Sequence, residues 1–214
     1  MRTNPFNDTW LFFIGQQPDQ LALGFWRWLV LLLFLGLMAG SVWALVVNWR
    51  RDPEQRSVAN LATWFVRVSL GGMWFQGALW KLPLPFSGPF LDWTKNIGEH
   101  AAFEAHRALA NDLLVPNIAL LGPVVFLAEL AFAASLILGL GVRLFALLAM
   151  GFALQLWLGL YLHPKEWPWI YWFLAVLMGL FAAQGAGRSL GVDAILRRDG
   201  GLPPGLARLH RLVS

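Results

Sequence analysis

The sequence predicts an all-α integral membrane protein with five transmembrane helices. Three observations lead to this prediction. Of the 214 residues, 58% are hydrophobic and only 13% are charged, whereas a soluble domain has about 25% charged residues. Five long apolar runs are each bounded by charged residues, proline or glycine, and about 20 apolar residues suffice for a helix to cross a bilayer. Many of the 13 tryptophans stand at the ends of these runs, where an amphipathic ring prefers the headgroup layer.

The first part of the chain is predicted to form a tail and one span. Residues 1–27 lack the basic start and the short apolar core of a cleavable signal peptide, so they are assigned to an N-terminal tail. Residues 28–49 carry no charge and are long enough to cross the bilayer at about 1.5 Å per residue. The segment Arg50-Arg51-Asp52-Pro53 ends this span, because proline disfavours helix before it and arginine prefers the headgroups.

A second span and a long loop follow. The span covers residues 58–81 and stops before Pro83 and Pro85. Residues 83–115 then form an outer loop that is rich in charged side chains. A modest helical stripe of apolar residues runs through this loop: Ile97, Ala101, Ala105, Leu109 and Leu113. Two interpretations stay open, an amphipathic helix that lies on the membrane or caps the bundle, and a structured loop with a charged helix.

The remaining spans are predicted at residues 116–139, 144–162 and 169–186. Very short connections separate these three spans, which makes the helices antiparallel neighbours. Residues 187–214 form a basic C-terminal tail with five arginines.

The distribution of basic residues predicts the orientation. Five spans place the two termini on opposite sides of the membrane. One side then carries Arg50, Arg51, Arg56, Arg143 and the five tail arginines, and the other carries Arg2, Arg27, Lys81, Lys95, Arg107 and Lys165. Nine basic residues against six favour an outer N-terminus and a cytoplasmic C-terminus in the cell inner membrane.

Two charged residues are predicted to form a buried ion pair. Counted from the outer ends of the second and third spans, Arg67 and Glu129 lie at matching depths of roughly 20 Å. An unpaired charge in lipid costs at least about 2.5–3.5 kcal/mol, so a pair between the two helices accommodates both. Either the pair only fixes the helix register, or it belongs to a proton-linked or quinone-linked site.

Polar residues in the outer halves of the second and fourth spans are candidates for ligand binding. They are Gln76, Trp80, Lys81, Gln155 and His163. Amide, ammonium and imidazole groups could donate hydrogen bonds to the carbonyl oxygens of a quinone. The alternative is that the amides bond to neighbouring helices and that the histidine is interfacial.

Several classes of site are not predicted. The chain has no cysteine, which excludes thiolate catalysis, iron–sulfur ligation and c-type haem attachment within it. His100 and His106 are six residues apart and do not share a helical face, so no haem or metal site is predicted. The basic residues flank apolar segments, which indicates contact with the lipid bilayer and not with nucleic acid.

Six short motifs follow one another along residues 60–196. They are Arg67-Val-Ser-Leu-Gly-Gly, Gln76-Gly77-Ala-Leu-Trp80-Lys81, Val115-Pro116-Asn117 ahead of Glu129, Leu138-Gly-Leu-Gly-Val-Arg143, His163-Pro164-Lys165-Glu166-Trp167 and Gly187-Arg188-Ser189-Leu190-Gly191-Val192-Asp193. In this order they resemble the DoxX/DoxD family of small bacterial and archaeal membrane proteins.

The resemblance implies a DoxX-like four-helix membrane core over residues 58–186, with the first helix as an N-terminal addition. It also implies one of two roles. In some members the core is the DoxD subunit of a thiosulfate:quinone oxidoreductase, which works with a second chain and uses quinone as its cofactor. Other members are accessory subunits, and the alternative for this chain is a non-catalytic structural subunit of a larger respiratory or photosynthetic membrane complex.

Overall fold

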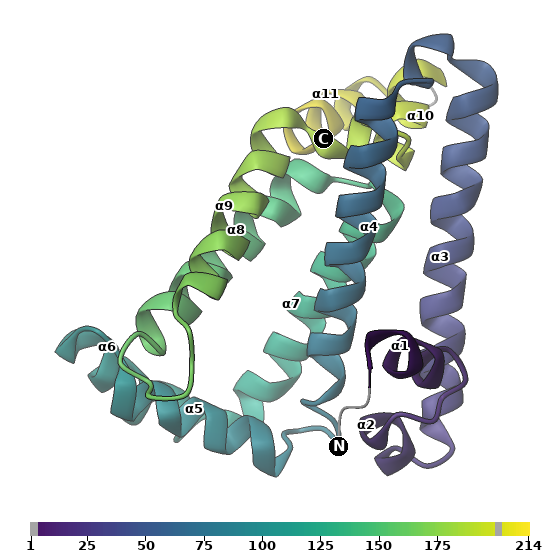
Figure 1. The fold of residues 1–214 in the computed structure, drawn as a ribbon. Helices are drawn as coiled ribbons and strands as arrows, with labels where there is room; N and C mark the ends of the chain where they lie inside the picture. Colours follow the sequence, from purple (N-terminus) through teal and green to yellow (C-terminus); the bar gives the residue numbers. More distant parts are fainter. Residues whose placement is uncertain (1–3, 200–202) are drawn as a thin grey trace.

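The computed structural model describes residues 4–199 and 203–214, which form helices joined by short turns and contain no β-strand. Five long helices make up the body of the molecule (Figure 1): α3 (Trp26–Arg51), α4 (Val58–Leu79), α7 (Ile118–Leu138), α8 (Val142–Gly159) and α9 (Trp169–Gln184). Among the described residues, α3, α7 and α8 are long and apolar enough to cross a membrane. Helix α9 is apolar but has 16 residues, and α4 carries the buried Arg67. These two helices coincide with the other two predicted spans.

The long helices pack as two antiparallel pairs. Helix α4 lies along α7 and α8 lies along α9, and the short α7–α8 turn joins the pairs (Figure 1). Helix α3 packs against α7. Close approach of α4 and α7 depends on Gly71, because a Cβ atom there would lie 2.6 Å from Cγ1 and 3.0 Å from the backbone nitrogen of Ile137. The backbones can therefore come closer than two helices with larger side chains would allow.

The predicted N-terminal tail is folded. Within the part of it that is described, α1 (Pro5–Phe13) and α2 (Pro18–Ala22) pack beside the first turns of α3. Phe12 of α1 is buried, with its ring centroid 4.9 Å from Phe34 of α3 and 6.4 Å from Phe75 of α4. An aromatic cluster thus joins α1, α3 and α4, and the segment is part of the bundle.

The predicted outer loop is mostly helical. It contains α5 (Gly88–His100), α6 (Glu104–Ala108) and the π-helix η2 (Leu109–Leu114). Helix α5 crosses the ends of α7 and α8 (Figure 1) and buries Phe90, Thr94, Ile97 and Gly98. An amphipathic helix therefore caps the bundle, but it is not the predicted one. The predicted stripe does not lie on one helix, because α5 ends at His100 and Ala105, Leu109 and Leu113 are exposed.

The opposite end is covered by the C-terminal segment. The basic tail folds into η3 (Ala186–Arg188), α10 (Val192–Asp199) and α11 (Pro204–Val213), next to the short η1 (Pro53–Gln55) between α3 and α4. The long helices turn large apolar side chains outward, among them Leu32, Val42, Phe65, Leu127, Leu148 and Phe173. An apolar exterior on helices of this length indicates a membrane-embedded protein in contact with lipid.

Candidate functional site: a chamber beneath helix α5

A cavity of about 260 Å³ lies where α5 and η2 cover the space between α7 and α8. Its wall is mainly aromatic and aliphatic and includes Phe90, Trp93, Ile97, Val125 and Phe152. Lys81, Glu129 and Gln155 supply charged and amide groups to the same wall. Apolar walls with a few converging polar groups are the usual make-up of a small-molecule site.

The two charges in this chamber belong to one ion pair. The ammonium Nζ of Lys81, just past the end of α4, lies 2.5 Å from Oε2 of Glu129 on α7. Their side chains are only 4% and 5% exposed. Lys81 also donates to the carbonyl of Gly77 at 2.7 Å and lies 4.2 Å from the ring centroid of Trp80. Each charge is thus neutralised by the other at a site that water barely reaches.

The predicted pair between Arg67 and Glu129 is therefore wrong. Arg67 is fully buried in the first half of α4, far from Lys81. Its Nη1 donates to the carbonyl oxygens of Leu136 and Ile137 in the last turn of α7. Its Nε and Nη2 atoms have no hydrogen-bond partner among the described residues. The guanidinium thus meets the partial negative charge at the C-terminal end of α7 and not a side-chain carboxylate.

The physical reason is an offset between α4 and α7. A Cβ atom on Gly77 would lie 3.9 Å from Oε2 of Glu129, so these two residues are level and Lys81, four residues after Gly77, is level with about residue 125 of α7. The chain turns sharply after α4, whereas the first turns of α7 continue outward by roughly 10 Å toward α5. There, a Cβ atom on Gly122 would lie 1.8 Å from the carbonyl oxygen of Pro85. Counting depth from equal outer ends therefore selected the wrong cation.

Gln155 reaches the chamber from α8 and connects it to α6. Its Nε2 lies 3.4 Å from Nε2 of His106. Burial lowers the pKa of His106, which favours the neutral ring that accepts this hydrogen bond from the amide. The second N–H of the Gln155 amide is then left to donate a hydrogen bond, and the amide carbonyl to accept one.

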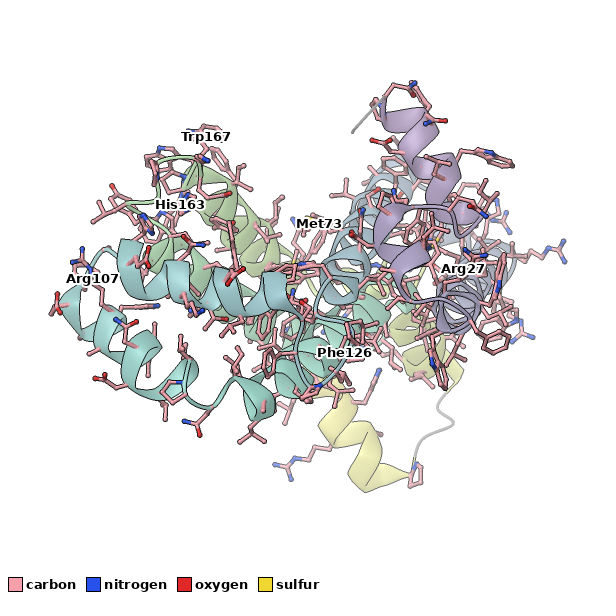
Figure 2. The ribbon with its side chains drawn as sticks, turned by 90° about the horizontal axis from the view of Figure 1, so that it is seen from below. Arg27, Met73, Arg107, Phe126, His163 and Trp167 are labelled. Carbon is pink, nitrogen blue, oxygen red and sulfur yellow. The ribbon has the colours of Figure 1, made fainter. Side chains whose placement is uncertain are left out.

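Two of the predicted ligand residues lie elsewhere. Gln76 is on the exposed side of α4 and donates to Oε1 of Gln17 at 3.2 Å. His163 lies in the α8–α9 turn, with its ring centroid 4.7 Å from that of His100. Figure 2, viewed from the α5 end, shows His163 and Arg107 at the edge of the layer that α5, α6 and η2 form over the bundle. Trp80, Lys81 and Gln155 are the predicted ligand residues that line the chamber.

Sequence reasoning missed the contribution of α5 and η2 to the chamber. Phe90, Trp93, Thr94 and Ile97 share one face of α5 and line the cavity. Their helical spacing was a visible signal that one face of this segment is buried. That spacing does not indicate which of the long helices the buried face of α5 packs against.

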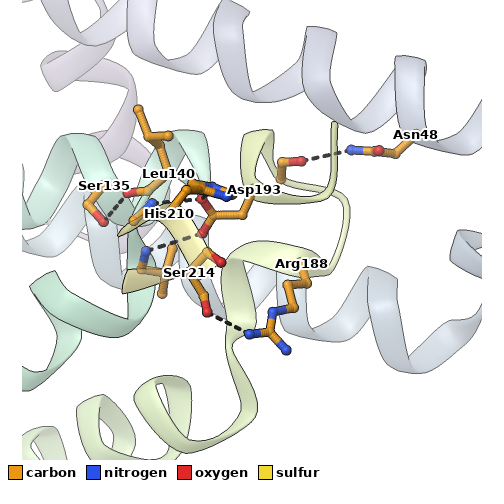
Figure 3. A network of polar contacts seen from close by, with 10 residues as sticks. Asn48, Ser135, Leu140, Arg188, Asp193, His210 and Ser214 are labelled. Atoms are coloured by element: carbon orange, nitrogen blue, oxygen red, sulfur yellow. Dashed lines mark hydrogen bonds and ion pairs between the residues drawn. The ribbon is translucent and has the colours of Figure 1, made fainter. Parts of the chain in front are cut away.

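A second polar cluster lies at the other end of the bundle (Figure 3). Asp193 is fully buried and accepts hydrogen bonds from the backbone N–H groups of Gly141 at 2.9 Å and Val142 at 3.3 Å. Its Oδ1 also lies 2.8 Å from Nε2 of His210 on α11. The carboxylate thereby caps the N-terminus of α8, where negative charge is favoured.

Further contacts make this cluster a clamp around the α7–α8 turn. Arg67 holds the end of α7, and the charge of Asp193 acts on it. Asn48 of α3 donates to the carbonyl of Gly191 at 2.9 Å, and Arg188 donates to the carbonyl of Ser214 at 2.7 Å (Figure 3). Three of the six family-like motifs therefore meet in one structural network.

Comparison with known proteins finds no matching protein-family model, no matching curated protein and no matching solved structure. The described residues also contain no group of three or more histidine, aspartate or glutamate side chains that could hold a metal ion.

Proposed function

We propose that this chain is a five-span, DoxX/DoxD-like membrane subunit whose chamber binds the head group of a quinone. The observation that supports the proposal is the Lys81–Glu129 pair set beside Gln155 in an otherwise apolar cavity. A quinone ring is flat and apolar and carries two carbonyl acceptors. Lys81 supplies a donor, Gln155 an amide, and Trp80, Phe90 and Trp93 supply flat apolar surface.

The size of the chamber limits what enters it. Its volume of about 260 Å³ is just below the ~300–1,000 Å³ of typical ligand pockets. A ring-sized head group is accommodated, and an isoprenoid tail would remain outside. The lining of Leu109, Leu114 and Leu121 suits such a tail, and Leu109 is 41% exposed.

The ion pair is suited to moving protons during quinone reduction. A quinone takes up two electrons and two protons to become a quinol. Lys81 can give one of these protons to a reduced oxygen and be reprotonated from water through Glu129, and a second such cycle supplies the second proton. The electrons would come from a donor such as thiosulfate through a partner chain, as the family resemblance implies.

The binding experiment uses two matched amides. The full chain, purified in mild detergent, is titrated with a short-tailed benzoquinone in an isothermal calorimeter. Gln155→Leu is expected to weaken binding at least tenfold, because a hydrogen bond to the head group is lost. Gln76→Leu removes an equivalent amide outside the chamber and is expected to bind normally. Equal affinities for all three proteins would contradict the proposal.

A second role, that of a non-catalytic accessory subunit, is supported by exposed aromatic residues at the α1–α2 end. Phe6 and Phe25 are 88% and 82% exposed. Exposed aromatic side chains of this size suit contact with other subunits of a respiratory or photosynthetic membrane complex. Native mass measurement after gentle extraction tests this role, and a lone 24.0 kDa species would count against it.

A further inference from the structure

A groove of about 340 Å³ lies at the end of the bundle opposite the chamber, between the last turns of α3 and the first turn of α4. Leu45, Val46, Trp49 and Arg50 line it from α3, and Leu61 lines it from α4. Leu61 and Val46 are partly exposed on the outer face of the helices. The groove is thus aliphatic along its length and has an aromatic and a cationic group at its end.

Basic groups gather where the groove reaches the end of α3. The Arg50 side chain is exposed. Arg56 donates from Nε to the carbonyl of Trp49 at 2.7 Å and from Nη2 to the carbonyl of Arg50 at 3.2 Å, which holds its guanidinium at the helix end. Asp52 and Glu54 are the carboxylates of this turn, and Asp52 accepts the backbone N–H of Glu54 at 3.0 Å.

We propose that this groove binds an anionic phospholipid. One acyl chain lies along Leu45, Val46 and Leu61, and the phosphate is bound by Arg50 and Arg56. Three features specify this occupant. The groove opens on the outer face of a helix long and apolar enough to span the membrane. Trp49 stands near the end of that helix, and tryptophan prefers the headgroup layer. The exposed guanidinium of Arg50 can bind phosphate with two parallel hydrogen bonds, and that of Arg56 adds positive charge beside it.

The site is independent of the chamber, so its test does not depend on quinone binding. The full chain is placed in nanodiscs of phosphatidylcholine with a minor fraction of phosphatidylglycerol, released gently, and analysed by native mass spectrometry for retained lipid. Retention of one phosphatidylglycerol per chain, in preference to phosphatidylcholine, is the expected result.

Two variants address the two parts of the site. Arg50→Gln is expected to lower phosphatidylglycerol retention about fivefold, the effect of one basic residue near an anionic headgroup. Leu61→Trp fills the groove and is expected to abolish retention of either lipid there. Arg197→Gln is the matched control, because Arg197 is an exposed arginine at the same end whose charge acts on Arg188. Circular dichroism verifies that each variant keeps its helix content.

Three results would overturn the proposal. The first is equal retention of the two lipids by the unaltered chain. The second is an equal loss with Arg197→Gln, which would mean that general surface charge attracts the lipid. The third is cross-linking between chains through a cysteine placed at Val46, which would show that a second copy of the protein occupies the groove.

Discussion

The Lys81–Glu129 pair places two charges within a membrane-embedded bundle at 2.5 Å from one another. Because the desolvation cost of both ions has already been met on folding, removing one partner leaves the other uncompensated. Replacing both by apolar groups of similar volume removes both costs together. The pair therefore adds little to the net stability of the fold, and its main effect is to place two polar groups in an apolar chamber.

Lys81→Met is therefore expected to destabilise the protein by about 3–5 kcal/mol, whereas the double variant Lys81→Met, Glu129→Met should lie close to the unaltered protein. Unfolding in mixed micelles with increasing denaturing detergent measures both. Lys95→Met serves as the control, since its 3.8 Å pair with Asp92 is largely exposed and should change stability by less than about 1 kcal/mol. A double variant as unstable as the single one would contradict this account.

His106 gives the chamber region a dependence on pH. Burial lowers its pKa in the folded protein, so the folded state binds fewer protons than the unfolded chain as the ring titrates. Its contribution to stability is present above the unfolded pKa of about 6.5 and is lost as pH falls toward the lower folded pKa. Protonation would also place a second donor against the amide of Gln155.

Unfolding midpoints measured between pH 7.5 and 5 should accordingly fall for the unaltered protein and fall less for His106→Gln. Gln76→Leu, a substitution outside the chamber that removes no titratable group, should keep the original pH dependence. If His106→Gln retains the full loss of stability, another group accounts for it.

At the level of elements, hydropathy predicted the long helices well and their mutual register poorly. The apolar runs of α3, α7 and α8 are long enough to be visible in any window of the sequence. The offset between α4 and α7 arises from contacts such as Gly77 beside Glu129 and Gly122 against Pro85. Such contacts join residues far apart in the chain, so no local pattern reveals them.

The candidate site was predictable to the same extent. Trp80, Lys81 and Gln155 were recognised because polar groups in apolar helices are costly without a purpose. Glu129 was recognised as needing a cation but was assigned the wrong one. The position of α5 over the chamber could not be predicted. An amphipathic face shows that one side of a helix is buried, but it does not show which helices that side packs against.

Two adjacent glycines test the α4–α7 contact. A Cβ atom on Gly71 would collide with Ile137, whereas one on Gly72 would meet no atom within 4 Å. Gly71→Ala is thus expected to destabilise the protein by about 1–3 kcal/mol through overpacking. Gly72→Ala should be neutral or stabilising by up to about 1 kcal/mol, from helix propensity. Detergent unfolding compares them, and equal effects would argue against close contact at Gly71.

For the whole molecule, the ends of the bundle differ in charge. Arg50, Arg56, Arg143, Arg188 and Arg197 belong to the end covered by α10 and α11, opposite the chamber (Figure 1). An excess of basic residues at one end favours that end as the cytoplasmic one. We therefore propose a topology of five spans in which the α5 end faces outward.

Because the sequence contains no cysteine, single introduced cysteines report this orientation without background. In intact cells, a membrane-impermeant maleimide is expected to label Asp92→Cys on α5 and to spare Glu54→Cys on η1. Opening the cells should make both reactive. Labelling of both sites in intact cells, or of Glu54→Cys alone, would contradict the proposed topology.

The clamp around the α7–α8 turn also has a consequence for the order of biosynthesis. With α4 as a proposed span, Arg67 would enter the membrane long before its partners at the end of α7 and the nearby Asp193 have been translated. Until then, its guanidinium can be accommodated only by water, lipid headgroups or the insertion machinery. Stable integration of α4 must therefore wait for later parts of the chain. Ribosome-stalled chains in which residue 136 is still inside the ribosome should leave α4 extractable at alkaline pH, and chains in which the end of α7 has emerged should not.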